Sequence, residues 1–156
     1  MNIDASLEQK LRSLPGRPMT ADEAERLHQA IPELAVPAVT ELLRGYPIIG
    51  SELSLPAELD ESGLGVELLW LSGDQIIGEA TEAQPGVAAA RHGFLPIGAC
   101  LLGSGDPYFL DTSEPEDPPL VRISHHAAVG DGELDPARIE VVSSSLSSFL
   151  GLADAG

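Results

Sequence analysis

The sequence has 156 residues, and its 25 acidic residues against 8 lysines and arginines give a formal net charge of −17 at pH 7. This charge argues against nucleic acid and anionic membranes as direct partners, because both repel a negative surface. A hydrophobic content of 43% with 21% charged residues excludes an intrinsically disordered chain. The length suits one domain, which we place at residues 1–152, with residues 153–156 as a short flexible tail.

The sequence also bears on location and redox state. No apolar run approaches the roughly 20 residues that span a bilayer, and the start of the chain lacks the basic and apolar blocks of a signal peptide. We therefore expect a soluble, cytoplasmic protein. The single cysteine, Cys100, has no partner for an intramolecular disulfide, and we expect a buried structural thiol.

Three helices are predicted in the first 45 residues. Asp4 is a suitable N-cap for a helix that runs to about Leu14. Thr20 and Glu23 form a capping box for a second helix, and a third begins at Pro37 and ends at Gly45. The apolar spacing predicts these inward faces: Leu7, Leu11 and Leu14; Ala24, Leu27, His28 and Ile31; Val39, Leu42 and Leu43.

From Gly50 onward the apolar pattern changes to the period of strands. A capping box of Ser72 and Gln75 predicts one short helix, 74–82, within this region, and Leu146, Phe149 and Leu150 define a closing helix that ends at Gly151. The sequence therefore predicts an α+β fold with N-terminal helices, a mostly antiparallel central sheet and a C-terminal helix. The expected strands are Glu52–Leu55, Val66–Trp70, Gly93–Gly98, Pro107–Leu110, Leu120–Ser124 and Ile139–Val142.

Candidate catalytic and metal-binding motifs are incomplete. Ser104 lies between two glycines but lacks the G-x-S-x-G pattern, so a tight turn is expected there. His125 and His126 would point to opposite faces of a strand and could not both bind one metal ion without a bend. The alternating acids that begin at Asp131 resemble the start of a calcium loop, but Pro136 occupies the position that requires glycine. We expect no catalytic residues, no metal and no cofactor.

The acidic residues are clustered, which favours a functional role over simple solubility. Between Arg44 and Arg91 there is no basic residue, and a second cluster around Pro115 predicts an exposed acidic loop. Such clusters steer a basic partner, while a solubilising surface is the alternative. Alternation places Tyr108 and Phe109 on opposite sheet faces, and we predict that Tyr108 is the exposed one. The predicted partner-binding residues are Glu67, Asp106, Tyr108, Asp111, Glu114, Glu116 and Asp117.

Several segments resemble the SMI1/KNR4 (SUKH) family. They are the strand sequence Phe94-Leu95-Pro96-Ile97-Gly98, the segment Gly105-Asp106-Pro107-Tyr108-Phe109-Leu110-Asp111, the closing segment 143–150, and the stretch WLSGDQIIGE from Trp70 to Glu79. The resemblance extends over residues 18–150 and rests on sheet and turn residues. The first half matches less closely because the usual aromatic residues are absent from Leu34–Leu43.

The resemblance implies a non-catalytic binding protein. Many bacterial members of this superfamily are thought to be immunity proteins that neutralise a toxin of a polymorphic or contact-dependent toxin system, and fungal members act in cell-wall regulation. A basic toxin domain such as a nuclease would suit the charge of this chain. Two alternatives remain: a regulatory or scaffold adaptor that binds a cellular protein, and a metal-dependent hydrolase. The sequence does not define the oligomeric state.

Overall fold

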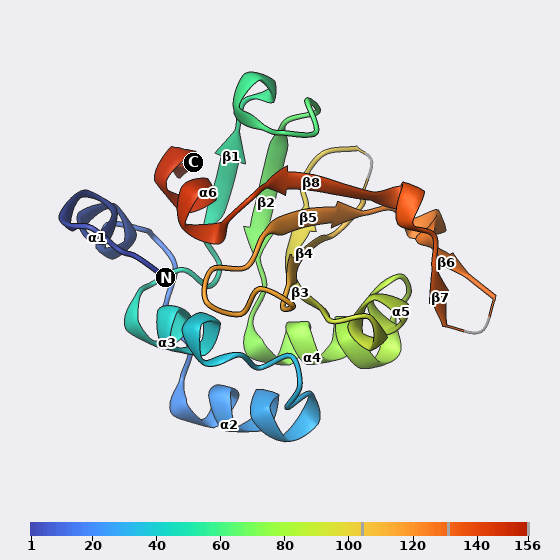
Figure 1. The fold of residues 1–156 in the computed structure, drawn as a ribbon. Helices are drawn as coiled ribbons and strands as arrows, with labels where there is room; N and C mark the ends of the chain where they lie inside the picture. Colours follow the sequence, from blue (N-terminus) through green and yellow to red (C-terminus); the bar gives the residue numbers. More distant parts are fainter. Residues whose placement is uncertain (104, 131, 156) are drawn as a thin grey trace.

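A computed structural model describes residues 1–103, 105–130 and 132–155, which form an α+β fold around a curled, seven-stranded antiparallel sheet (Figure 1). The strand order is β8-β5-β4-β3-β2-β1-β9. The predicted α+β fold with N-terminal helices, antiparallel sheet and C-terminal helix is confirmed. The strands are β1 (Glu52–Leu55), β2 (Val66–Trp70), β3 (Phe94–Cys100), β4 (Tyr108–Asp111), β5 (Leu120–Ile123), β8 (Ile139–Ser143) and β9 (Asp154–Ala155).

Six α-helices are formed by the described residues, and side-chain caps fix the starts of several of them. Asp4 accepts a hydrogen bond from the Leu7 amide, and the capping boxes predicted at Thr20 and Ser72 are both present. α5 was not predicted, because it has only six residues, begins with glycine and has no side-chain cap. The helices are α1 (Ala5–Arg12), α2 (Ala21–Ala30), α3 (Pro37–Gly45), α4 (Gly73–Glu82), α5 (Gly86–Arg91) and α6 (Leu146–Leu152).

The remaining elements are short. Three 3-10 helices cover Ala57–Leu59, His125–Ala127 and Pro136–Arg138, and β6 (Ala128–Val129) pairs with β7 (Glu133–Leu134) as a separate hairpin. None of the helices in the described part of the chain has the length and apolar composition needed to cross a membrane.

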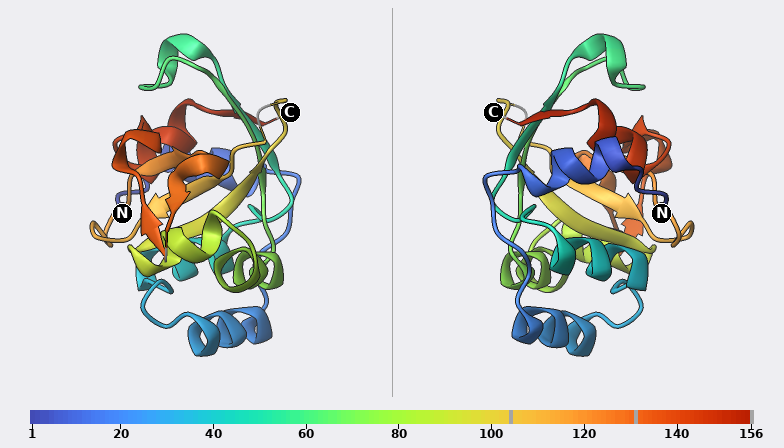
Figure 2. Two further views of the ribbon diagram at one scale, coloured as in Figure 1. Left: turned by 90° about the vertical axis from the view of Figure 1, so that its right-hand side faces the viewer. Right: turned by 90° about the vertical axis from the view of Figure 1, so that its left-hand side faces the viewer.

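Four helices, α2, α3, α4 and α5, gather at one end of the sheet, and the β1–β2 and β3–β4 loops lie at the other. Figure 1 shows α2, α3 and α4 below the sheet, while the β1–β2 loop lies at its opposite end; Figure 2 shows the same division from both sides. The main hydrophobic core contains Trp70, Tyr108 and Phe149, and a smaller core on the other sheet face contains Phe109 and Ala89. Both faces of the central strands are therefore covered.

This double coverage corrects the prediction for Tyr108. Tyr108 and Phe109 point to opposite faces, as expected, but both are fully buried. Tyr108 faces the main core, and Phe109 lies in the smaller core with Ala89 and Val121. The prediction that Tyr108 is exposed was wrong because alternation indicates which face a side chain points to, and not whether that face is covered.

Three further expectations differ from the structure. Residues 153–155 are ordered, because Ala153 is buried and β9 pairs with β1, while residue 156 lies outside the described part. His28 is exposed, because α2 buries Leu27 and not its neighbour on the edge of the apolar face. Cys100 forms no disulfide and is only partly buried, since it lies at the end of β3.

Candidate functional site

The predicted binding residues lie at opposite ends of β4. Glu67 on β2 and Asp106 before β4 lie at the loop end of the sheet, whereas residues 111–117 follow β4 toward the helical end. Tyr108, at the start of β4, is buried between them. The structure therefore separates these residues into two surfaces.

Within the acidic β4–β5 loop, two of the predicted carboxylates hold the loop together. Asp111 Oδ1 accepts hydrogen bonds from the Ser113 amide (3.0 Å) and hydroxyl (2.7 Å). Asp117 accepts one from the Ser147 amide (2.9 Å) and another from the Ser147 hydroxyl, at the first turn of α6. Asp111 therefore accepts through one oxygen and Asp117 through both, and these bonds lie within the fold. Glu114 and Glu116, in contrast, are exposed.

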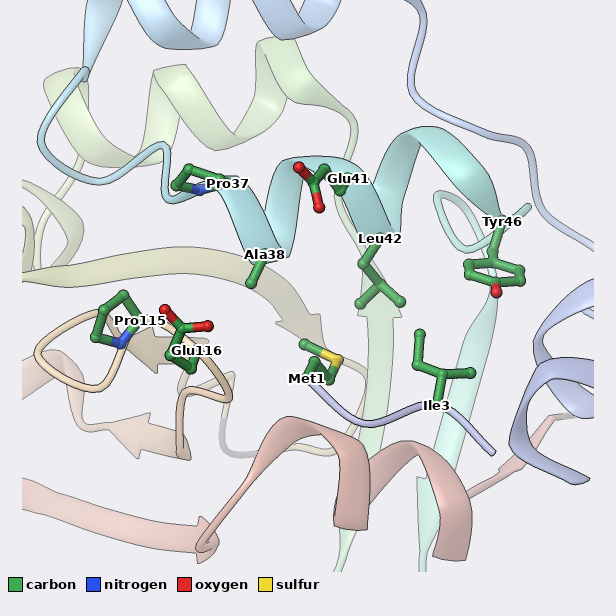
Figure 3. Close-up of a pocket in the computed structure, with 9 residues that line it drawn as sticks. All are labelled: Met1, Ile3, Pro37, Ala38, Glu41, Leu42, Tyr46, Pro115 and Glu116. Atoms are coloured by element: carbon green, nitrogen blue, oxygen red, sulfur yellow. The ribbon is translucent and has the colours of Figure 1, made fainter. Parts of the chain in front are cut away.

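Glu116 forms one wall of a hollow of about 370 Å³ between the N-terminal segment, α3 and the β4–β5 loop (Figure 3). Glu41 lies on α3 across from it, and the side chains of Leu42, Met1 and Ile3 point into the space between α3 and the N-terminal segment. We call this site the acidic hollow. It is lined by Met1, Ile3, Pro37, Ala38, Glu41, Leu42, Tyr46, Pro115 and Glu116.

The acidic hollow combines an apolar floor with two uncompensated carboxylates. Among the described residues, neither Glu41 nor Glu116 forms an ion pair, and no lysine, arginine or histidine lines the space. Tyr46 is already engaged, since its hydroxyl donates to Glu8 Oε1 (3.3 Å) and its ring lies 5.1 Å from the Arg12 guanidinium carbon. The arrangement suits a long cationic side chain, whose methylene groups contact the floor while the charged end reaches the carboxylates.

At the loop end, Asp106 orients a histidine. Its Oδ1 accepts a hydrogen bond from the backbone amide of His125 (3.2 Å) and lies 2.6 Å from His125 Nδ1. His125 and His126 belong to a 3-10 helix and not to a strand, and both are exposed. Glu67 is exposed on β2. Asp106 therefore has a positioning role, while Glu67 is oriented toward solvent.

Beneath this end lies a buried ion pair that the sequence analysis missed. Arg122 Nη2 lies 3.4 Å from Asp60 Oδ2, and both side chains are almost completely buried. Burial opposes the charge of Arg122, but its contacts with Tyr108 and the charge of Asp60 outweigh this effect and raise the pKa of Arg122. Burial raises the pKa of Tyr108 despite the hydrogen bond from Arg122. The available signal was one arginine within the otherwise apolar strand Leu120–Ile123.

The described residues contain no group of three or more histidine, cysteine, aspartate or glutamate side chains that could hold a metal ion. The turn expected at Ser104 and the calcium-like pattern that begins at Asp131 both include positions outside the described part of the chain. The Cys100 thiol lies beside the Tyr108 hydroxyl.

Comparison with known proteins gave no match, whether to a family model, to a curated protein or to a solved structure. The functional interpretation therefore rests on the residues, the fold and the two surfaces described above.

Proposed function

We propose that this chain is a non-catalytic binding protein for a basic protein partner. The observation that carries the proposal is the acidic hollow, in which Glu41 and Glu116 line the same partly apolar space and, among the described residues, neither forms an ion pair. A lysine or arginine side chain of the partner would enter this hollow. Its aliphatic stem would be desolvated against Leu42 and Ile3, and its charge would replace water around the two carboxylates.

The net charge of −17 supports the same proposal through association kinetics. Exposed carboxylates create a negative field that attracts a basic protein and raises the association rate, and salt screens this attraction. Asp111 and Asp117 contribute to this field even though their hydrogen bonds lie within the fold. Glu114 and Glu116 add charge without such internal bonds.

The biological form of this function that we favour is immunity to a toxin. A bacterial polymorphic or contact-dependent toxin system pairs a toxin domain with a protein that occludes it, and the segments similar to the SMI1/KNR4 family support this assignment. A nuclease toxin would be suitably basic, because it must bind the phosphate backbone. The immunity protein would act in the cytoplasm, where such a toxin meets its substrate.

The first test is identification of the partner. The tagged full-length protein is isolated from its own host at low and at high salt, and the retained proteins are identified. We expect a basic toxin-like protein that is lost as the salt concentration rises. A stable complex with a housekeeping protein would replace the immunity role with an adaptor role, and recovery of the protein alone while the toxin is present would refute the proposal.

The second test measures binding of that partner to charge-neutral variants. We expect Glu41→Gln and Glu116→Gln each to weaken binding about tenfold, because a desolvated cation loses one of its two carboxylates. Glu114→Gln is the matched control, since Glu114 is exposed in the same loop but does not line the acidic hollow. Equal effects for all three variants would indicate that only the overall field contributes.

A further inference from the structure

Two loops at the end of the sheet opposite the helices expose leucine side chains. Leu64 in the β1–β2 loop is 61% exposed, and Leu101 and Leu102 in the β3–β4 loop are 47% and 41% exposed. Figure 1 places both loops at this end of the sheet. Large aliphatic side chains are usually buried, and exposed apolar groups that gather around a concavity often mark an interaction site.

Leu64 and Leu102 line a concavity of about 230 Å³, which we call the leucine hollow. Leu64 and Gly65 come from the β1–β2 loop and Leu102 from the β3–β4 loop, so residues far apart in the sequence meet there. The space is large enough for one apolar side chain. The residues that line it are Leu64, Gly65, Leu102, Asp106, Arg122 and Glu140.

The positive charge of Arg122 is neutralised within the fold. The guanidinium donates to the Gly65 carbonyl (2.6 Å), to the Ser62 hydroxyl (2.9 Å) and to Asp60 (3.4 Å). Because these acceptors fix its position and Asp60 balances its charge, Arg122 serves as a rigid part of the floor. It neither repels a cationic partner nor offers a free anion site.

The wall of the leucine hollow is held in place before any partner arrives. The Glu61 amide donates to the Val142 carbonyl (2.9 Å), and the Ser144 amide donates to Glu61 Oε2 (2.6 Å). These two bonds attach the β1–β2 loop to the other side of the curled sheet. Ordering that loop therefore adds little to the free-energy cost of binding.

Two carboxylates, Asp106 and Glu140, line the leucine hollow and favour a positively charged neighbour for whatever enters it. Glu67 lies nearby on β2, where its backbone carbonyl accepts a hydrogen bond from the Leu101 amide (2.8 Å). Within the part of the chain that the structure describes, neither Glu67 nor Glu140 is ion-paired, while Asp106 is paired with His125. A second copy of the chain would bring like charges together here, whereas a basic segment would be complementary.

We infer that the leucine hollow binds an apolar side chain that projects from a basic segment of a protein partner. A lysine or arginine neighbour of that side chain pairs with Glu140, which lines the leucine hollow. The inference rests on the proposed function, to which it adds a second contact surface at the opposite end of the molecule from the acidic hollow.

The test uses three synthetic helical peptides and the full-length protein. One peptide combines leucine with lysine, the second leucine with glutamate and the third serine with lysine. Backbone amide chemical shifts report where each peptide binds, and fluorescence anisotropy reports the affinity. We expect the leucine–lysine peptide to shift the amides of Leu64, Gly65 and Leu102, and the other two to leave them unchanged.

Variants separate the apolar contribution from charge. The double variant Leu64→Ser and Leu102→Ser should bind the leucine–lysine peptide at least about tenfold more weakly, because the apolar side chain of the peptide loses the leucine surface against which it is buried. Leu152→Ser is the matched control, because Leu152 is comparably exposed outside the leucine hollow. Circular dichroism establishes that the variants fold, and the shift map of the unaltered protein tests the site independently of them.

Shifts confined to other surfaces, or equal binding of the leucine–lysine and serine–lysine peptides, would overturn the inference. The proposed function is tested separately with the serine–lysine peptide and the Glu41→Gln and Glu116→Gln variants. If the Glu41→Gln and Glu116→Gln variants abolish binding of the serine–lysine peptide, while the leucine double variant binds the leucine–lysine peptide as tightly as the unaltered protein does, the acidic hollow is a binding site and the leucine hollow is not.

Discussion

Two buried carboxylates, Glu23 near the helical end and Asp60 at the loop end, are stabilised in different ways. Glu23 Oε1 accepts from the Thr20 amide (3.1 Å) and Arg17 Nη1 (2.6 Å), and Oε2 accepts from the Gly73 amide (2.9 Å) and Arg17 Nη2 (3.1 Å). Each oxygen therefore accepts two hydrogen bonds, one from a backbone amide and one from Arg17, whose side chain is half-exposed.

Asp60 has a less balanced environment. Its Oδ1 accepts from the Ser62 amide and hydroxyl, both at 2.7 Å, whereas Oδ2 has one hydrogen-bond partner among the described residues, Arg122 at 3.4 Å. Both members of this pair are buried, so each depends on the other for charge compensation. The two buried carboxylates therefore differ in their arginine partners: Arg17, which pairs with Glu23, is half-exposed, whereas Arg122, which pairs with Asp60, is buried and needs Asp60 to balance its charge.

Breaking the interior pair should have the largest effect. We expect Arg122→Met to lower the free energy of unfolding by roughly 3–5 kcal/mol, because it leaves the Asp60 carboxylate buried without a cation. Urea denaturation measures this loss. Arg138→Met is the control, since Arg138 and Asp135 form an exposed pair at 3.9 Å and should contribute less than about 1 kcal/mol. Similar losses for both variants would contradict the distinction.

The ion pair and hydrogen bonds of Glu23 should make the free energy of unfolding depend on pH. The hydrogen bonds from Arg17 are the main cause that lowers the pKa of Glu23 to about 2 from an ordinary value of 4.5. Because the folded pKa is depressed, the stabilisation is complete above pH 4.5 and is lost as the pH falls toward 2. A shift of this size corresponds to about 3 kcal/mol.

Glu23→Gln isolates this contribution from the other carboxylates. The variant should be less stable than the unaltered protein at pH 7, and the difference between them should shrink as the pH approaches 2. Denaturation curves across this range measure the difference, with Glu25→Gln on the exposed side of α2 as the control. A difference that stays constant with pH would show that the carboxylate charge contributes nothing.

We expect the smallest effects on stability in the acidic β4–β5 loop, where Asp117 accepts hydrogen bonds within the fold and Glu116 is exposed. Asp117→Ala should cost about 1 kcal/mol, because it removes the acceptor for the Ser147 amide at the first turn of α6. Glu116→Ala should change stability by less than about 0.5 kcal/mol. Thermal unfolding measures both, and a reversed order would show that Glu116 also supports the fold.

The parts of the fold that depend on neighbours in the sequence could be predicted. The Thr20–Glu23 and Ser72–Gln75 capping boxes, and the alternation of Val66, Leu68 and Trp70, each require only a few adjacent positions. The Gly73 amide that meets Glu23 is 50 residues away, and Arg122 is 62 residues from Asp60. The spacing of residues within one helix or strand does not indicate contacts over such sequence distances.

In the candidate sites too, some residues could be predicted from the local sequence and others could not. Composition and proline content indicated an acidic loop around Glu116, but Glu41, which shares the acidic hollow, comes from α3 and gave no separate signal. The leucine hollow was not predicted, because its walls are loops from different hairpins. Tyr108 was assigned to the surface because the helix and loops that cover a sheet face cannot be inferred from strand alternation.

Both edges of the sheet are shortened by the chain itself: at one end the edge strand is β9, which has only two residues, and at the other the Glu61 amide already bonds the Val142 carbonyl of β8. A partner that adds a strand to an open sheet edge binds mainly through backbone hydrogen bonds. It therefore requires a long row of free amides and carbonyls at that edge. This molecule instead offers side chains around its hollows. Exposed residues such as Glu41 and Leu64 could therefore be exchanged for new partners over evolution while the buried framework stays the same.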